Sequence, residues 1–226
     1  MEIRELRIKM AGEYTSHIAK LEGAEQWLQR YADNQAFLYR VHDWLVTDKG
    51  DELTDTDSEI VYKKLLSSIW VKGQDFSFQC NRDNMKRIVE GSTDLLTPLL
   101  PLGTIVDLKK EHLADIFPAD KINQLRFMID YRYSFYDTCS VYLPYGGIVY
   151  PLGRIGEAQV LYFTPQLVEK VVYMGFQDEM ETAYEVEMKK ELILQKGMKS
   201  LAFANGEEKR QFQQQVKTKE GKQHGV

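Results

Sequence analysis

The pattern of hydrophobic and polar positions changes character near residue 95. Before that point, apolar residues recur mostly at spacings of three and four, over 16–45 and again over 58–72. This period is typical of amphipathic helices. We therefore predict a long helix over 16–45, capped by Ser16 and interrupted near Asp33, then an acidic loop and a second helix over 58–72.

A third helix is predicted over 81–91, in the segment NRDNMKRIVEG. Asn81 or Asp83 suits its N-cap, and Gly91 suits its end because glycine is favoured just past a helix C-terminus. The first ten residues fit either a strand or a helix. The first part of the chain is thus expected to be mostly helical.

Pro98 and Pro101 mark a boundary, because neither proline can lie inside a helix or a central strand. Beyond this boundary the pattern becomes typical of strands. Runs rich in β-branched and aromatic residues predict an antiparallel sheet of three to five strands over 100–163. The runs are TIVDL, LRFMIDYRY, TCSVYLPY and QVLYFT. A helical turn at PQLVEK, a short strand at VVYMG and a long helix over 177–196 are predicted to follow.

These elements predict an α+β protein with a helical N-terminal region, a small, mainly antiparallel sheet domain and a long C-terminal helix. We place the helical region at 1–95 and the α+β domain with its helix at 96–200. The remaining segment, 201–226, is rich in Gln and Lys and nearly free of apolar residues. It is expected to be a polar, flexible tail because it has little apolar surface to bury.

Charge and hydropathy narrow the cellular setting of the protein. The 226 residues carry a net charge of −5 with a pI near 5.5, which argues against binding to nucleic acid. The first residues, MEIRELRIKM, lack the apolar run of a signal peptide, and no stretch reaches the roughly eighteen apolar residues that cross a bilayer. We expect a cytoplasmic protein that does not insert into membranes.

Candidate chemistry is sparse along the chain. The four histidines and two cysteines lack metal-ligand spacing, and no nucleophile or phosphate-binding motif is present. The acidic loop over 48–59 resembles a calcium loop, but Gly50 and Leu53 occupy the wrong positions. Cys80 and Cys139 are expected to be reduced thiols. We expect neither enzymatic activity nor a cofactor or metal.

The segment 177–196 begins with a series of carboxylates, which could be catalytic, bind a metal or form a surface for a partner. An apolar stripe shares the same predicted helix, so an amphipathic helix with an acidic solvent face is the favoured interpretation. A cluster of arginines and tyrosines on the predicted sheet suits an interface, or equally a half-exposed sheet face. The residues expected to contact a partner are Trp27, Leu28, Tyr31, Arg132, Tyr133, Tyr136, Met180 and Tyr184, the first three as an exposed stripe.

An ordered series of short motifs also resembles a known family. They are Leu100-Pro101-Leu102-Gly103-Thr104, Tyr136-Asp137, Tyr150-Pro151-Leu152-Gly153, and Phe163 to Glu181 with its Gly-aromatic-x-Asp-Glu ending. Over about 95–185 the chain resembles a small family of domains of unknown function encoded beside LXG toxin genes, in type VII secretion loci of Gram-positive bacteria.

This resemblance implies an accessory protein of toxin export. On that basis we expect a non-enzymatic cytosolic chaperone or adaptor that binds an LXG-type toxin. The alternative is an immunity protein that neutralises the toxin domain, for which the negative charge would suit a basic toxin. The oligomeric state is left open.

Overall fold

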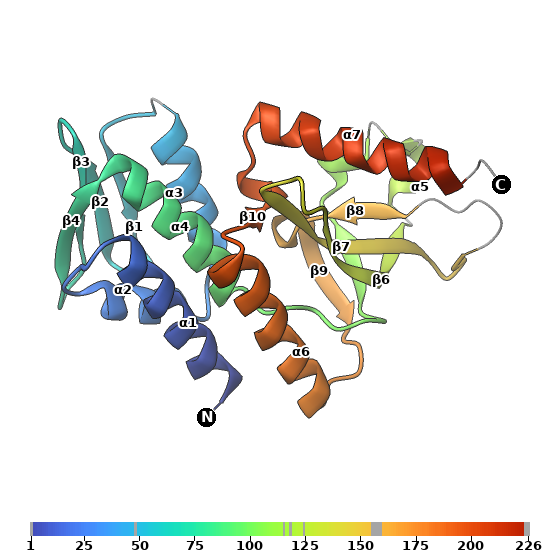
Figure 1. The fold of residues 1–226 in the computed structure, drawn as a ribbon, viewed down its shortest axis with the longest axis horizontal. Helices are drawn as coiled ribbons and strands as arrows, with labels where there is room; N and C mark the ends of the chain where they lie inside the picture. The colour runs from blue at the N-terminus through green and yellow to red at the C-terminus, as the bar shows by residue number, and fades with distance from the viewer. Residues whose placement is uncertain are drawn as a thin grey trace. The chain divides into compact units, whose positions relative to one another are not determined.

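A computed structural model describes residues 2–47, 49–114, 116–117, 119–123, 125–154 and 160–223. It confirms the α+β class, with helices and mainly antiparallel strands (Figure 1). The chain forms two compact units. Unit 1 consists of Met1–Pro98 and Val186–Gly197, and unit 2 consists of Leu99–Glu185 and Met198–Val226. The three consecutive parts predicted from the sequence contain no such return to the first unit.

Unit 1 has three helices, a four-stranded antiparallel meander in the order β1-β2-β3-β4, and a fourth helix. These elements are α1 (Ile3–Ile18), α2 (Ala24–Tyr31), α3 (Ala36–Val46), β1 (Glu52–Asp55), β2 (Ile60–Lys64), β3 (Ser68–Lys72), β4 (Ser77–Asn81) and α4 (Arg82–Leu96). The predicted interruption near Asp33 is confirmed, since it separates α2 from α3. Ser16 is not an N-cap, because it lies inside α1.

The helix predicted over 58–72 is wrong, because this segment forms the β2–β3 hairpin. Ile60 and Tyr62 on β2 are buried in alternation, as are Ile69 and Val71 on β3. The N–H of Leu65 donates to the Ser68 carbonyl at 2.8 Å and closes the turn. Alternation within each short strand, added across the turn, imitates a helical period.

The helix predicted over 81–91 is α4, which runs on to Leu96. The side chain of Asn81 caps it, accepting from the N–H of Asn84 at 2.7 Å, as expected. Gly91 does not end the helix. A Cβ at Gly91 would lie 2.1 Å from the Tyr14 ring of α1, so the glycine permits close packing of two helices.

The segment Val186–Gly197 completes unit 1. It contains the end of α6 (Glu179–Lys189) and its π-helical continuation η3 (Lys190–Gln195). Leu192 and Ile193 are buried. The buried Lys189 ammonium donates to the carbonyls of Leu95 and Thr97 at 2.9 and 2.6 Å. These two carbonyls lie at the end of α4, where helix carbonyls have no partner within the helix.

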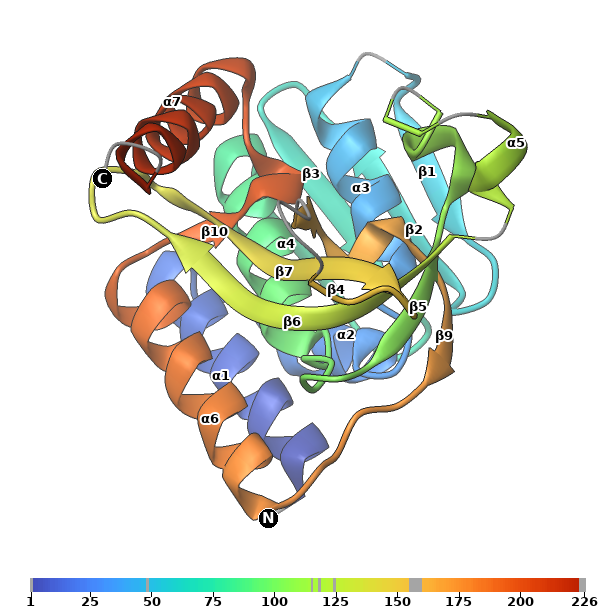
Figure 2. The same cartoon turned by 90° about the vertical axis from the view of Figure 1, so that its right-hand side faces the viewer.

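Unit 2 is built on one sheet with the strand order β10-β7-β6-β5-β9, in which β8 also pairs with β7. The predicted strands over 100–163 are confirmed, and Figure 2 shows the long β6–β7 hairpin. The strands are β5 (Ile105–Leu108), β6 (Arg126–Phe135), β7 (Val141–Tyr150), β8 (Leu161–Phe163), β9 (Val168–Tyr173) and β10 (Lys199–Ser200). The short helices η1 (Lys110–His112), α5 (Ala119–Ile122) and η2 (Pro165–Leu167) lie between strands, and η4 (Leu201–Phe203) follows β10.

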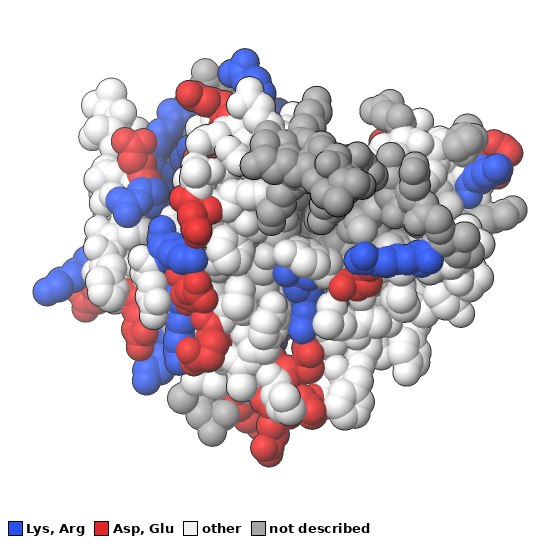
Figure 3. All heavy atoms as spheres, turned by 45° about the vertical axis from the view of Figure 1, so that its right-hand side comes forward, with Lys and Arg blue, Asp and Glu red and all other residues white. Residues whose placement is uncertain are grey.

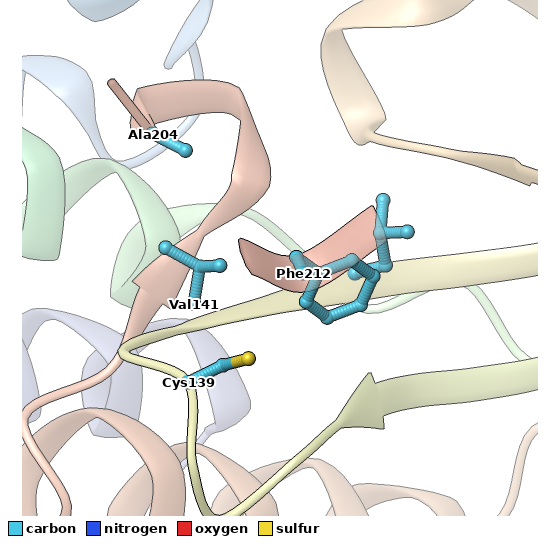
Figure 4. Packing of buried hydrophobic residues seen from close by; sticks show 5 residues of the cluster. Cys139, Val141, Ala204 and Phe212 are labelled. Carbon is cyan, nitrogen blue, oxygen red and sulfur yellow. The ribbon is translucent and has the colours of Figure 1, made fainter. Parts of the chain in front are cut away.

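Residues Gly206–Gln223 of the predicted tail form helix α7, and 224–226 lie outside the described residues. Phe212 of α7 is buried in a small cluster with Cys139, Val141 and Leu143 (Figure 4). Its ring lies 5.3 Å from that of Tyr136, centroid to centroid. Phe212, together with the partly buried Val216, thus gives an otherwise polar helix a packed face.

Candidate functional site

The three N-terminal residues expected in an exposed stripe, Trp27, Leu28 and Tyr31, are completely buried in unit 1. The expectation that they are exposed is wrong, because these side chains form the core between α2 and the meander. The Trp27 indole N–H donates to the Tyr62 hydroxyl at 2.8 Å, and Tyr62 donates to Tyr31 at 2.9 Å. Tyr31 in turn donates to the Asp55 carboxylate at 3.0 Å.

This buried chain of hydrogen bonds has a structural explanation. Burial raises the pKa of both the Tyr31 and the Tyr62 hydroxyls, so both remain protonated donors. Asp55 also accepts from the N–H of Asp57 at 3.2 Å. Each polar group in this series of hydrogen bonds, from Trp27 to Asp55, therefore has a partner. Buried polar atoms require such partners.

The predicted residues on β6 and directly after it lie in unit 2 and serve different roles. The Tyr133 ring is buried against Tyr142, with ring centroids 5.6 Å apart. Tyr136 packs on Phe212. The nearly buried Arg132 guanidinium pairs bidentately with Glu181, with N–O distances of 2.5 and 3.1 Å. The side chains of Arg132, Tyr133 and Tyr136 are thus engaged in contacts within unit 2 and offer little surface to a partner.

The other two predicted residues, Met180 and Tyr184, are exposed on α6 in unit 2. They belong to a larger group of exposed apolar side chains at the connection between β9 and α6. We call this group the junction surface; it consists of Leu102, Met174, Phe176, Met180 and Tyr184. Phe176 and Met180 each retain 78 % of their surface exposed.

A buried threonine holds the two loops of the junction surface together. The Thr104 hydroxyl donates to the Pro101 carbonyl at 2.7 Å and accepts from the N–H of Gly175 at 3.1 Å. Gly175 lies so close to the Leu102 carbonyl that a Cβ would approach its oxygen to 2.2 Å. The first and last motifs of the sequence series therefore meet in space, 71 residues apart.

An ion pair and a cation–π contact fix the start of α6. Besides binding Glu181, the Arg132 guanidinium lies 4.5 Å from the centroid of the Tyr184 ring. Burial raises the pKa of the Tyr184 hydroxyl, and the positive charge of Arg132 opposes that change. Bidentate pairs of this kind add geometric specificity as well as energy.

Carboxylates border the apolar group. The Asp178 side chain accepts from the N–H of Glu181 at 2.9 Å and so caps α6. Glu179 follows in the first turn and is exposed. Figure 3 shows acidic side chains gathered at the lower edge of the face that it presents. The positive end of the helix dipole stabilises such carboxylates.

Three junction residues, Leu102, Met174 and Phe176, were not among the predicted contact residues. A signal for two of them was present in the sequence, because Leu102 and Phe176 lie inside the Leu-Pro-Leu-Gly-Thr and Gly-aromatic-x-Asp-Glu motifs. A pattern of hydrophobicity cannot tell an exposed loop residue from a buried one. The pairing of β5 with β9 and the hydrogen bond between Thr104 and Gly175 bring the two motifs together.

A cavity of about 500 Å³ in unit 2 has Asp107 and Arg126 in its lining, and these two pair with each other at 3.2 Å. Burial raises the pKa of the Cys80 thiol to about 11, which disfavours the thiolate. No group of three or more His, Cys, Asp or Glu side chains among the described residues could hold a metal ion. Within the same residues, no helix is long and apolar enough to cross a membrane.

Comparison with known proteins agrees with the extent of the sequence resemblance. No curated protein and no solved structure matches the chain. Residues 99–184, which include the whole junction surface, match the family model described as "Domain of unknown function (DUF4176)".

Proposed function

We propose that this protein is a non-enzymatic chaperone or adaptor that binds an LXG-type toxin in the cytosol for type VII secretion. The junction surface is the observation that carries the proposal of a binding function. The kind of partner comes from the sequence resemblance over about 95–185.

The junction surface has the properties of a binding site. Large apolar side chains grouped on a surface mark interaction sites more often than chance. Phe176 and Met180 contribute little to the core because most of their surface is exposed. Thr104 and Arg132 nevertheless hold the surrounding backbone in place through buried contacts. A preformed surface loses less conformational entropy when a partner binds.

Co-purification tests the proposal. The toxin encoded beside the gene would be divided into N-terminal, central and C-terminal parts, and each part would be co-expressed with the protein. We expect capture of the N-terminal or central part by the wild type and loss of capture by the double variant Phe176→Ser/Met180→Ser. Leu66→Ser is the matched control, because Leu66 is a fully exposed apolar residue of unit 1.

The same experiment examines the alternative of an immunity protein. Capture of the C-terminal toxin part alone, with loss of toxicity, would replace the export chaperone by an immunity protein. The net charge of −5 is the observation that favours this alternative, because it would suit a basic toxin domain. Failure to capture any part would contradict both functions.

A further inference from the structure

The apolar side chains on α6 form a row of a particular geometry. Met180 and Tyr184 are four residues apart on the helix, and Phe176 lies four residues before Met180 in the preceding loop. Met180 and Tyr184 therefore lie on one ridge of α6, of the kind that fits into the grooves of another helix, whereas Phe176 lies in the loop just before the helix. Ala183, a small exposed residue, lies beside Tyr184 in the helix sequence and allows a second backbone to approach closely.

The charge next to this row is negative. Asp178 and Glu179 precede Met180, and neither forms an ion pair with any basic side chain that the structure describes. The side chain of Arg132 is almost buried and pairs with Glu181. A bound partner therefore encounters exposed apolar side chains beside two carboxylates that no described basic side chain neutralises.

We propose that the junction surface binds an amphipathic α-helix of the partner, with large apolar residues at spacings of three and four and Lys or Arg beside them. The proposal rests on the binding role given to this surface under Proposed function. The apolar face of the helix covers Phe176, Met180 and Tyr184, and its basic residues pair with Asp178 and Glu179. The same two carboxylates repel a helix that carries acidic residues at these positions, which disfavours binding of acidic helices.

The edge of the sheet is a poorer site for an added strand. β9 is one edge strand of the sheet, next to the junction surface, and it carries exposed Glu169 and Lys170 in its middle. Charged side chains on an edge strand oppose pairing with another strand. The exposed apolar residues lie instead beyond the end of β9, where a helix can contact them.

A peptide-binding experiment on the full chain tests this inference without the toxin. The probe is a fluorescent 18-residue amphipathic peptide with Leu and Phe on one face and Lys at the flanking positions. Two comparison peptides carry Glu in place of Lys, or one central proline. We expect the basic helical peptide to bind at least about tenfold more tightly than either comparison peptide.

Variants locate the binding. Phe176→Ser/Met180→Ser is expected to weaken binding of the basic peptide at least about tenfold. Asp178→Asn/Glu179→Gln, which keeps a helix-capping residue, is expected to weaken it several-fold in low salt and little in high salt. The controls are Leu66→Ser and Glu22→Gln/Glu25→Gln, the latter removing two exposed carboxylates at the start of α2. Urea unfolding of each variant identifies any that fails to fold.

The outcomes separate the inference from the proposed function. Equal binding of the acidic or proline peptide, or equal weakening by the control variants, would overturn the helix proposal. Toxin capture that depends on Phe176 and Met180, without binding of the basic helical peptide, would overturn it while leaving the proposed function in place. Peptide binding without capture of any toxin part would overturn the proposed function alone.

Discussion

Gly175 is the residue on which the junction surface depends most directly. A Cβ there would lie 2.2 Å from the Leu102 oxygen and 3.0 Å from the Thr104 nitrogen. We predict that Gly175→Ala destabilises the protein by about 1–3 kcal/mol, because backbone atoms must move to accept the methyl group. Urea denaturation measures the change, and the toxin co-purification should weaken with it.

The matched control is Gly12→Ala. Gly12 lies inside α1 with no atom within 4 Å of the position of an added Cβ. Alanine there should stabilise the helix by up to about 1 kcal/mol. If Gly175→Ala unfolds at the same urea concentration as the wild type, the close approach of the two loops does not matter for stability.

Lys189 allows a second prediction at the scale of single residues. Its buried ammonium donates to the Leu95 and Thr97 carbonyls, so Lys189→Met leaves both acceptors unpaired. We predict a loss of about 1–3 kcal/mol in the free energy of unfolding. Lys190→Met, which removes only the exposed pair with Glu187, should change it by less than about 1 kcal/mol. Equal effects of the two changes in urea denaturation would contradict this assignment.

At the scale of elements, helix α7 is held by a cap. The Asn205 side chain accepts from the N–H groups of Glu207 and Glu208, and the Glu208 carboxylate accepts from the Asn205 N–H at 2.8 Å. Glu208 also pairs with Lys199 at 3.3 Å. This is the reciprocal arrangement of a capping box, with Asn as the capping residue.

The cap predicts a dependence on pH. Partial burial opposes ionisation of Glu208, but the Asn205 hydrogen bond and Lys199 lower the pKa of its carboxyl below the ordinary 4.5. A lowered pKa in the folded state means that the contribution to stability is present above pH 4.5 and is lost as the pH falls further. Glu208→Gln should therefore cost about 0.5–2 kcal/mol at neutral pH and progressively less in acid.

Denaturation of Glu208→Gln over a range of pH measures this effect. Glu207→Gln is the control, because it removes a neighbouring carboxylate that, unlike that of Glu208, accepts no hydrogen bond from Asn205. A cost that stays constant from neutral pH to pH 3 would show that ionisation of Glu208 does not stabilise α7.

The helices and strands of the structure also show which elements could be predicted from the sequence alone and which could not. Strands β5 to β8 were predictable because β-branched and aromatic runs are separated by Gly and Pro. The β2–β3 hairpin was not, because its two short strands together imitate a helical period. The end of α4 was misplaced for a different reason, since Gly91 serves packing against Tyr14 and not chain reversal. Local patterns do not reveal contacts between distant segments.

The residues of the candidate site likewise divide into those that local spacing predicted correctly and those that it did not. Met180 and Tyr184 were predicted from helical spacing on a segment that is a helix. Trp27, Leu28 and Tyr31 have the same kind of spacing, but the unpredicted meander buries them. Exposure of an apolar stripe depends on what packs against it, which a single amphipathic pattern does not contain.

At the scale of the whole molecule, the order of the chain makes unit 1 discontinuous. The N-terminal segment ends at Pro98, and Val186–Gly197 returns to complete the unit. Leu192 and Ile193 of the returning segment are almost completely inaccessible to solvent. Burial of two such side chains is worth up to about 3–6 kcal/mol, which is a large part of the stability of a small domain.

We therefore predict that a fragment of residues 1–98 does not unfold cooperatively by itself and that a synthetic peptide of residues 186–197 restores a cooperative urea transition. The buried Trp27 and Trp44 provide the fluorescence signal. A peptide with Ser at both Leu192 and Ile193 should not restore the transition, because it cannot replace the buried apolar surface. Cooperative unfolding of the fragment at the same urea concentration with either peptide, or with none, would show that unit 1 needs only its N-terminal segment. Loss of the transition in the fragment alone would mean that the chain must pass through the whole of 99–185, with its junction surface, before unit 1 is complete.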